Sequence, residues 1–384
     1  MPSTATTLAT ELDILVVGAG VVGLACATML RVHGHTVAVV ERERRAGTVT
    51  SARNSGVVHA GIHGPVGSLK TRLCIEGARR LYAWCERYGV PHARTGKWVL
   101  AVEPGEAPEL EALDAHAHEL GATGPIERVS AAELARREPS LRAAEALYFG
   151  PSGLVDAHAF VESLRAEAER TGVIVALGAE ATALRHDGHA WHVDIRRTPF
   201  AARATEPPER VTAGVIVNAA GLEAPTVAAE SGIDLERHGW VPRLVKGSYF
   251  TVSPRVPLPN VPLVYPLPSG DGGLGIHLTR TLGGEWLAGP DVEPVETHDF
   301  DVHATRGARF ATSVARYAPA IRPEHLSPAY AGIRPKLGTT GFHDFVLTRG
   351  DAHGAPDSVH LLGIESPGLT ASLAIAEEVV RLLT

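Results

Sequence analysis

The sequence feature that most constrains the fold is a glycine-spaced turn, G-A-G-V-V-G, at residues 18–23. A β-branched apolar run, Asp13–Val17, precedes this turn, and an apolar stretch with helical periodicity follows it at residues 24–33. A second apolar run at residues 36–40 ends at Glu41. This order, over about 30 residues, is typical of a β-α-β unit in which two parallel strands flank a helix. We therefore expect an α/β protein built around a parallel sheet.

The spacing of the glycines also predicts a dinucleotide site. Gly18 permits the tight turn, Gly20 lets the backbone approach a pyrophosphate, and Gly23 lets the helix pack on the strand. The helix N-terminus then presents amide donors to the phosphates. Glu41, which lies 18 residues after Gly23, can bond to ribose hydroxyls, and its charge disfavours the 2′-phosphate of NADP. Because we find no second fingerprint of this kind, we expect a single nucleotide, either FAD or NAD.

Composition excludes several other classes of protein. The chain has 384 residues, a net charge of −7 and only 5% aromatic residues, which argues against a nucleic-acid binder with a basic face. Three cysteines without a C-x-x-C pair favour a reducing cytosol over a disulfide framework, and no metal site is predicted. The N-terminus lacks a basic region and a cleavage site, so we expect no signal peptide. The most apolar run, Ile14–Leu30, is too short and too rich in glycine to predict a membrane span, although peripheral membrane contact stays open.

The segment that follows the β-α-β unit favours FAD. Residues 51–62, S-A-R-N-S-G-V-V-H-A-G-I, resemble the corresponding loop of the D-amino-acid-oxidase (DAO) superfamily of flavoproteins, and more narrowly that of the L-2-hydroxyglutarate dehydrogenase/oxidase family. The resemblance continues in the same order along nearly the whole chain. It is carried by G-S-L-K with R-L-C at 67–74, G-L-V-D at 153–156, K-G at 246–247, A-G-I-R-P-K-L at 331–337 and E-S-P-G-L-T-A-S at 365–372.

The resemblance implies a mixed α/β fold with two domains. Residues 1–88, 150–235 and 325–384 would form a discontinuous, Rossmann-like FAD-binding domain. Residues 89–149 and 236–324 would form an inserted mixed-sheet domain that binds the substrate. The implied activity is the oxidation of a 2-hydroxy acid, similar to L-2-hydroxyglutarate, to the 2-oxo acid by hydride transfer to flavin N5.

The glycine fingerprint and the resemblance together predict which residues contact FAD. The last helix is expected to point its N-terminus at the pyrimidine edge of the flavin, where its dipole would stabilise negative charge on the reduced ring. The predicted contact residues are Gly18, Gly20, Val21, Val22, Gly23, Glu41, Arg42, Ser51, Arg53, Asn54, Ser55, Gly56, Val57, His59, Ala181, Ala220, Gly221, Gly332, Arg334, Pro367, Gly368, Leu369 and Thr370.

Five residues are candidates for catalysis and substrate binding. In the family an arginine in the setting of Arg334 pairs with the substrate carboxylate, and a guanidinium offers two parallel donors that match a carboxylate. His59 lies in the loop expected to cross the flavin, where a neutral imidazole can take the hydroxyl proton. His277 is the rival base. Lys246 and Tyr249 are further candidates for substrate contacts, with Lys246 on a second carboxylate.

One departure from the family bears on the substrate. The family usually carries two aromatic residues after A-G-I, whereas this chain has His63-Gly64. The change removes bulk near the expected pocket mouth, so we expect a larger or differently charged hydroxy acid than 2-hydroxyglutarate. The electron acceptor stays open between O₂, a quinone and a carrier protein. An amine or D-amino-acid oxidase, a non-catalytic flavin-binding subunit of a complex and a simple NAD dehydrogenase remain alternatives.

Overall fold

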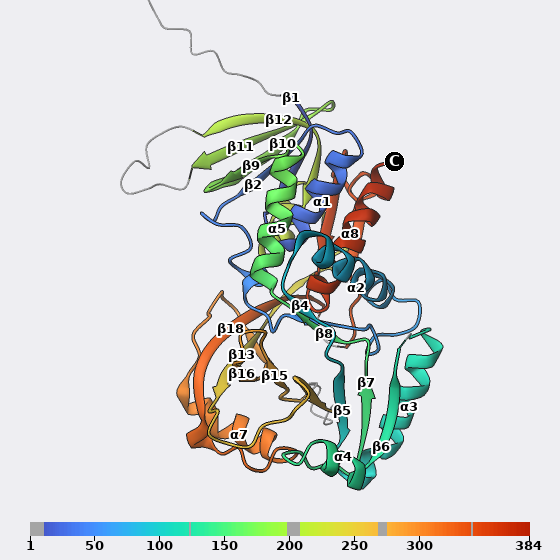
Figure 1. Cartoon of the computed structure of the whole chain (residues 1–384). Coiled ribbons are helices and arrows are strands. Elements are labelled where there is room, and N and C mark those ends of the chain that lie inside the picture. Colours follow the sequence, from blue (N-terminus) through green and yellow to red (C-terminus); the bar gives the residue numbers. More distant parts are fainter. Residues whose placement is uncertain (1–10, 123, 198–207, 268–274, 339–340) are drawn as a thin grey trace, which may run out of the picture.

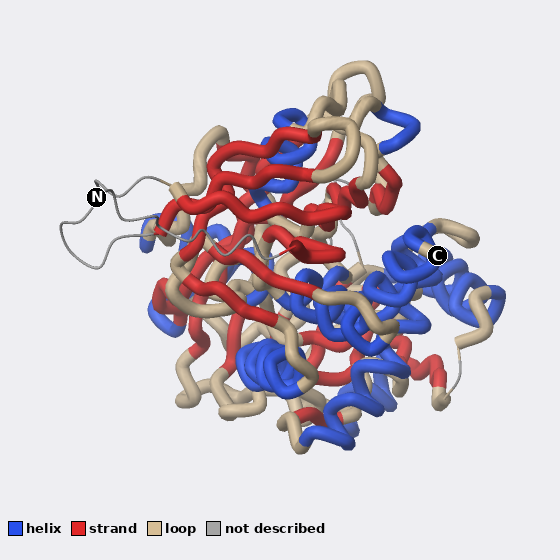
Figure 2. The backbone as a smooth tube through the Cα atoms, turned by 90° about the horizontal axis from the view of Figure 1, so that it is seen from above, coloured by secondary structure: helices blue, strands red, loops and turns tan. Residues whose placement is uncertain are grey.

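The protein is described by a computed structural model that covers residues 11–122, 124–197, 208–267, 275–338 and 341–384. Figure 1 shows two parts, each organised around a large sheet. The upper part carries most of the long helices, and Figure 2 shows these helices (blue) grouped beside the strands (red). Within the described part of the chain, no helix is both long enough and apolar enough to cross a membrane.

The upper sheet has eight strands and contains the predicted parallel unit. Five strands pair in parallel, in the order β9, β2, β1, β12 and β20, and antiparallel strands flank them. The strands are β1 (Glu11–Val17), β2 (Val37–Glu41), β9 (Ile174–Leu177), β10 (Ala179–His186), β11 (Trp191–Arg197), β12 (Glu209–Asn218), β19 (Val346–Arg349) and β20 (Ser358–Leu362).

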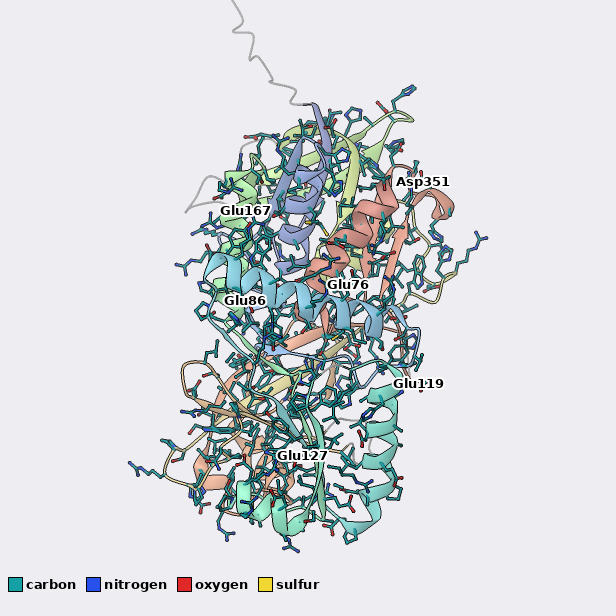
Figure 3. All side chains as sticks on the ribbon, turned by 45° about the vertical axis from the view of Figure 1, so that its right-hand side comes forward. Glu76, Glu86, Glu119, Glu127, Glu167 and Asp351 are labelled. Carbon is teal, nitrogen blue, oxygen red and sulfur yellow. The ribbon has the colours of Figure 1, made fainter. Side chains whose placement is uncertain are left out.

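Strand β1 is apolar on both faces because both faces are covered. Ile14 and Val16 pack with the helices, whereas Leu15 and Val17 pack with residues of β10 and β11. The helices on the first face include α1 (Val21–Val32), α2 (Leu69–Tyr88), α5 (Ala157–Arg170) and α8 (Gly368–Leu383). Figure 3 shows α2, with Glu76 and Glu86 labelled, crossing the molecule between the two parts.

The lower sheet has nine strands and is mostly antiparallel. Its path runs β17 (Glu293–Val295), β13 (Pro242–Val252), β16 (Trp286–Ala288), β15 (Leu278–Arg280), β14 (Leu263–Pro266), β5 (Lys97–Ala101), β7 (Glu145–Phe149) and β6 (Ile126–Ser130), and β18 (Leu326–Leu337) pairs with β13. Helices α3 (Ala107–Glu119), α4 (Ala131–Arg137) and α7 (Gly307–Ala315) lie on the outside of this part (Figure 1). The remaining elements are a small sheet of β3 (Val57–Val58), β8 (Gly153–Val155) and β4 (His92–Ala93), and helix α6 (Ala224–Glu230).

The mixed α/β fold is confirmed, and the exact domain boundaries stay a prediction. Strand pairing departs from the predicted segments at one place. The boundary at residue 325 groups Leu326–Leu337 with the FAD-binding segments, but β18 hydrogen-bonds along β13 in the lower sheet. The reason is that the segment enters the lower sheet as a long antiparallel partner of β13 before the chain returns to β19 and β20.

Candidate active site

A cavity of about 1160 Å³ is lined by residues of both large sheets. Gly18 and Glu41 line it from the upper sheet, and Lys97 and Tyr265 line it from the lower sheet. Pockets for one drug-sized ligand measure about 300–1000 Å³. The cavity therefore has room for a dinucleotide together with a small substrate.

The glycine turn forms a cradle at one end of the cavity. Gly18 has a φ of +105°, and a Cβ there would lie 2.5 Å from the carbonyl oxygen of Ala219. A Cβ on Gly23 would overlap the carbonyl oxygen of Gly18. Gly20 lies at the N-cap of α1 and lines the cavity. The turn therefore leaves space for a phosphate group at the helix N-terminus, which suits the predicted cofactor.

Two side chains hold this cradle in place. Ser51 Oγ accepts a hydrogen bond from the backbone N–H of Val21 at 3.0 Å. Glu41 accepts from the N–H of Ala19 through Oε2 at 2.8 Å and from the N–H of Glu43 through Oε1 at 2.9 Å. The Glu41 carboxylate is thereby fixed at the end of β2, where a ribose would be bound.

At the other end of the cavity, the N-terminus of α8 meets the loop that carries His59. The residues from Pro367 to Thr370 line the cavity at the start of this 16-residue helix. Thr370 Oγ1 accepts from the N–H of His59 at 3.1 Å and donates to the carbonyl of Val57 at 3.3 Å. The positive end of the helix dipole and the His59 loop are therefore held together beside the cavity.

Nearly all of the residues predicted to contact FAD line this one cavity. Gly23 and Gly56 are the exceptions. Gly23 instead packs α1 against the turn, which is its predicted role, and Gly56, with a φ of +66°, lies against the carbonyl of Val155. The prediction of Gly56 as a direct contact is not supported by its position, because its turn faces β8 and not the cavity.

His59 is a half-buried residue that lines the cavity. Desolvation and, next, the charge of Lys97 lower its pKa from 6.5 to about 3. The carbonyl of His59 accepts from Cys74 Sγ at 3.4 Å. The imidazole is therefore neutral near pH 7 and has a nitrogen able to accept a proton, as the predicted base requires.

Arg334 is oriented by carbonyl groups. Its Nη1 and Nη2 donate to the carbonyl of Asp291 at 3.3 and 3.2 Å. A Cβ on Gly247 would lie 2.7 Å from Nη2, so the absence of a side chain there makes room for the guanidinium. Within the described ranges no carboxylate pairs with Arg334. Its charge faces the cavity and is available to an anion.

Tyr249 and His277 also line the cavity. Burial raises the pKa of Tyr249, and the Tyr249 hydroxyl forms a hydrogen bond with the Ser55 side chain. The Tyr249 ring stacks on the ring of Tyr330. His277 stacks on Tyr265 with ring centroids 3.6 Å apart. His277 immediately precedes β15.

The structure does not bring Lys246 to the cavity. Val245, Gly247 and Tyr249 line it, whereas Lys246 lies on the other face of β13 because side chains alternate along a strand. The Lys246 ammonium pairs with Asp299 Oδ2 at 2.6 Å. The predicted contact of Lys246 with a substrate carboxylate is therefore corrected.

Several charged residues in the cavity are missing from the predicted set. Lys97 begins β5 and is 1% exposed. Glu365 Oε1 accepts from Lys70 at 2.7 Å and from Lys336 at 2.9 Å. Glu365 immediately precedes the turn into α8, which could have suggested a structural role. Lys97 has a weaker signal, namely a single charge at the start of the apolar run K-W-V-L-A.

Comparisons with known proteins agree with this arrangement. The family model "DAO: FAD dependent oxidoreductase" matches residues 13–382. The mitochondrial L-2-hydroxyglutarate dehydrogenase of Arabidopsis thaliana is 36% identical, over 98% of this chain and 84% of that protein. Its Caenorhabditis elegans counterpart is 29% identical, over 95% of this chain and 91% of that protein. The structure of L-alpha-glycerophosphate oxidase from Mycoplasma pneumoniae with FAD bound superposes with a TM-score of 0.86 at 26% identity, covering 97% of this chain and 94% of that one.

Proposed function

The chain belongs to the DAO family of FAD-dependent oxidoreductases, and we propose that it oxidises a 2-hydroxy acid similar to L-2-hydroxyglutarate to the 2-oxo acid. The proposal depends on one observation: a cationic group and a neutral proton acceptor line the same cavity. Arg334 offers a carboxylate-binding charge, and His59 offers a neutral proton acceptor. The similarity to relatives named L-2-hydroxyglutarate dehydrogenase supports this substrate class.

FAD, when bound, supplies the hydride acceptor for this reaction. The glycine turn at residues 18–23 and Glu41 would hold its dinucleotide portion, and the start of α8 would face its flavin. The chain's own residues then bind and orient the substrate. The two donors of Arg334 hold the C1 carboxylate, which presents C2 and its hydroxyl in one orientation.

His59 is proposed to remove the hydroxyl proton as the C2–H bond breaks. Its neutral imidazole accepts the proton on a ring nitrogen, and the electron pair of the O–H bond forms the C=O bond of the product. A bound carboxylate raises the pKa of a neighbouring histidine, so the dicarboxylate itself would strengthen this base. His277, held against Tyr265, is the alternative base.

A glycerol phosphate is the second candidate substrate. The supporting observation is the structural similarity, at 26% identity, to a protein named L-alpha-glycerophosphate oxidase. Its substrate also presents a CH–OH group and an anion. An amine or amino acid is not favoured by these observations.

Product analysis with matched substrates tests the proposal. The holoenzyme is incubated in three separate reactions with L-2-hydroxyglutarate, L-glutamate or L-glycerol 3-phosphate. Each reaction contains the same artificial electron acceptor. We expect 2-oxoglutarate from the first substrate, detected as its hydrazone, and turnover at least ten-fold lower with the others. Preferential turnover of glutamate would overturn the proposal, and preferential turnover of the glycerol phosphate would support the second candidate.

The proposal extends to the compartment and to the physiological electron acceptor. Three buried free thiols, Cys26, Cys74 and Cys85, suit a reducing compartment such as the cytosol. Reoxidation of the reduced protein by O₂, compared with a soluble quinone, would separate an oxidase from a dehydrogenase. Fractionation of the source cells would test the compartment.

A further inference from the structure

A second cationic group lies in the cavity, on a different strand from Arg334. Lys97 is 1% exposed and lines the cavity from β5. Its Nζ lies 3.2 Å from His63 Nε2 and 4.8 Å from the centroid of the Tyr265 ring. No carboxylate of the described residues pairs with it. A buried ammonium without an anion is costly, so such a site is stabilised when an anionic ligand arrives.

His63, which contacts the Lys97 ammonium, does not neutralise its charge. Desolvation and then the charge of Lys97 lower the pKa of His63 well below 6.5, with smaller effects from nearby histidines. His63 is therefore neutral and accepts the Lys97 hydrogen bond on Nε2. Burial lowers the pKa of Lys97 from 10.5 to about 8, so the ammonium stays mostly protonated near pH 7. The pair presents one positive charge to the cavity.

The other two lysines of the cavity each pair with the same carboxylate. Lys70 and Lys336 both pair with Glu365 at the turn into α8. Of the three cavity lysines, Lys97 alone lacks a carboxylate partner among the described residues, a feature that it shares with Arg334.

Lys97 and Arg334 are separated along the lower sheet. Strands β13, β16, β15 and β14 lie between β18, which carries Arg334, and β5, which carries Lys97. Figure 1 shows β18 and β5 on opposite sides of the lower part. Both cations line the same cavity, where Tyr249 is influenced by the charge of Arg334 and Tyr265 lies beside Lys97. A ligand that reaches both cations must carry an anion at each end.

We propose, on the basis of the function proposed above, that Lys97 with His63 binds the distal carboxylate of the substrate and so selects 2-hydroxy dicarboxylic acids over monocarboxylic ones. His63 holds the Lys97 ammonium in position, and Arg334 holds the other carboxylate, beside the reacting carbon. This assignment gives a role to the His63-Gly64 departure. It replaces an aromatic residue by an acceptor that orients Lys97.

Two substrates of equal chain length test the proposal. We compare kcat/KM for L-2-hydroxyglutarate and L-2-hydroxypentanoate in the wild type, in Lys97→Met and in Lys246→Met. The Lys97→Met variant keeps the side-chain length and removes the charge. We expect it to lower kcat/KM for the dicarboxylate at least ten-fold more than for the monocarboxylate. Lys246→Met is the matched control, because Lys246 is a buried lysine outside the cavity. Lys246 contacts Arg334 through its backbone carbonyl, so a loss in this variant should fall equally on both substrates and leave their ratio at the wild-type value.

Binding without turnover provides a second readout. Glutarate and pentanoate lack the hydroxyl group and are titrated into the holoenzyme by calorimetry. We expect Lys97→Met to weaken glutarate binding at least ten-fold more than pentanoate binding. The subsite is overturned if Lys97→Met weakens the binding of glutarate and pentanoate equally. It is also overturned if Lys97→Met and Lys246→Met change the ratio of kcat/KM for the two substrates by the same factor.

The outcomes separate this inference from the proposed function. If the wild type oxidises no 2-hydroxy acid but binds glutarate in a Lys97-dependent way, the reaction is wrong and the subsite stands. If it oxidises both 2-hydroxy acids equally well and Lys97→Met affects both alike, the reaction stands and the subsite is wrong. If it neither oxidises a 2-hydroxy acid nor binds glutarate, both are wrong.

Discussion

At the scale of single residues, Arg334 donates hydrogen bonds to the carbonyls of Lys246 and Asp291, which orient its charge without neutralising it. The sequence could predict this residue because its motif resembles that of the family. It could not place Lys246 correctly. The run R-L-V-K-G-S-Y-F in β13 is buried at most positions, so polarity does not reveal which alternate residues face the cavity.

Replacing Arg334 by lysine tests the carboxylate contact. A lysine keeps the charge but loses the paired donors, and hydrogen bonds to charged groups contribute about 1.5–3 kcal/mol each. We expect kcat/KM for L-2-hydroxyglutarate to fall about 10- to 100-fold while the FAD content is retained. Steady-state kinetics and the flavin absorbance measure the two effects. An unchanged kcat/KM would remove Arg334 from the substrate site.

The pH dependence of kcat/KM reports on Lys97 and His59. Because the pKa of Lys97 is lowered to about 8, its charge is lost above that pH, and kcat/KM for the dicarboxylate should fall there. Burial raises the pKa of Cys74 to about 12 and also raises that of Tyr265, so neither group titrates near 8. With a pKa near 3, His59 should give no acid limb near pH 6.5.

The same profile in Lys97→Met is the control. The alkaline limb near pH 8 should disappear for the dicarboxylate, and the monocarboxylate should show no such limb in either protein. An alkaline limb that survives in the variant belongs to another group and contradicts the assignment.

At the scale of elements, the strand–turn–helix at residues 11–32 follows directly from its sequence. The apolar run, the glycine spacing and the following helix are local signals, and the structure confirms each of them. The lower sheet depends instead on long-range pairing between strands such as β5 and β14, whose register no local pattern specifies. This pairing is why the sequence does not predict Lys97 as part of the site.

Replacing Gly18 in the glycine turn by alanine should weaken FAD binding. An alanine at position 18 would meet the carbonyl of Ala219 and would need a φ of +105°. We expect Gly18→Ala to bind FAD about ten-fold more weakly or worse, because about 1.4 kcal/mol of strain suffices for that factor. The absorbance ratio of flavin to protein after purification and dialysis measures it.

Gly34→Ala is the matched control for this change. Gly34, just after α1, has a φ of +95°, but a methyl group added there would have no neighbour within 4 Å, so the variant carries backbone strain without a clash. It should be slightly destabilised and keep its FAD. Equal loss of FAD in both variants would show that the turn acts only through general stability.

The Lys70–Glu365–Lys336 cluster joins α2, β18 and the turn into α8. Burial would raise the pKa of Glu365, but the two lysines outweigh it, and the net pKa lies below 4.5. The cluster therefore stabilises the fold above about pH 4.5, and this contribution is lost as the pH falls through the lowered pKa. Glu365→Gln should reduce the free energy of unfolding by about 3 kcal/mol at neutral pH, because it leaves Lys70 buried without a counter-charge.

Urea unfolding at neutral pH and near pH 4 measures this effect. The difference between wild type and Glu365→Gln should narrow at the lower pH, where the wild-type carboxylate begins to protonate. A difference that does not depend on pH would assign the loss to packing and not to the ion pairs.

At the scale of the whole molecule, the cofactor site and the substrate site draw on different parts of the chain. Most of the predicted FAD contacts belong to the upper sheet and its loops, which local motifs identify. The lower sheet supplies Arg334, Tyr249 and Lys97 to the same cavity. The fold class followed from sequence, whereas the placement of Arg334 and Lys97 in one cavity required the three-dimensional arrangement.

The most direct test of the account is an anaerobic visible spectrum of the holoenzyme titrated with L-2-hydroxyglutarate. We expect the flavin band near 450 nm to bleach with about one equivalent of substrate and 2-oxoglutarate to appear in equal amount. L-2-hydroxypentanoate should bleach the band far more slowly. A band that L-2-hydroxyglutarate leaves unchanged, while an amino acid bleaches it, would contradict the proposed reaction.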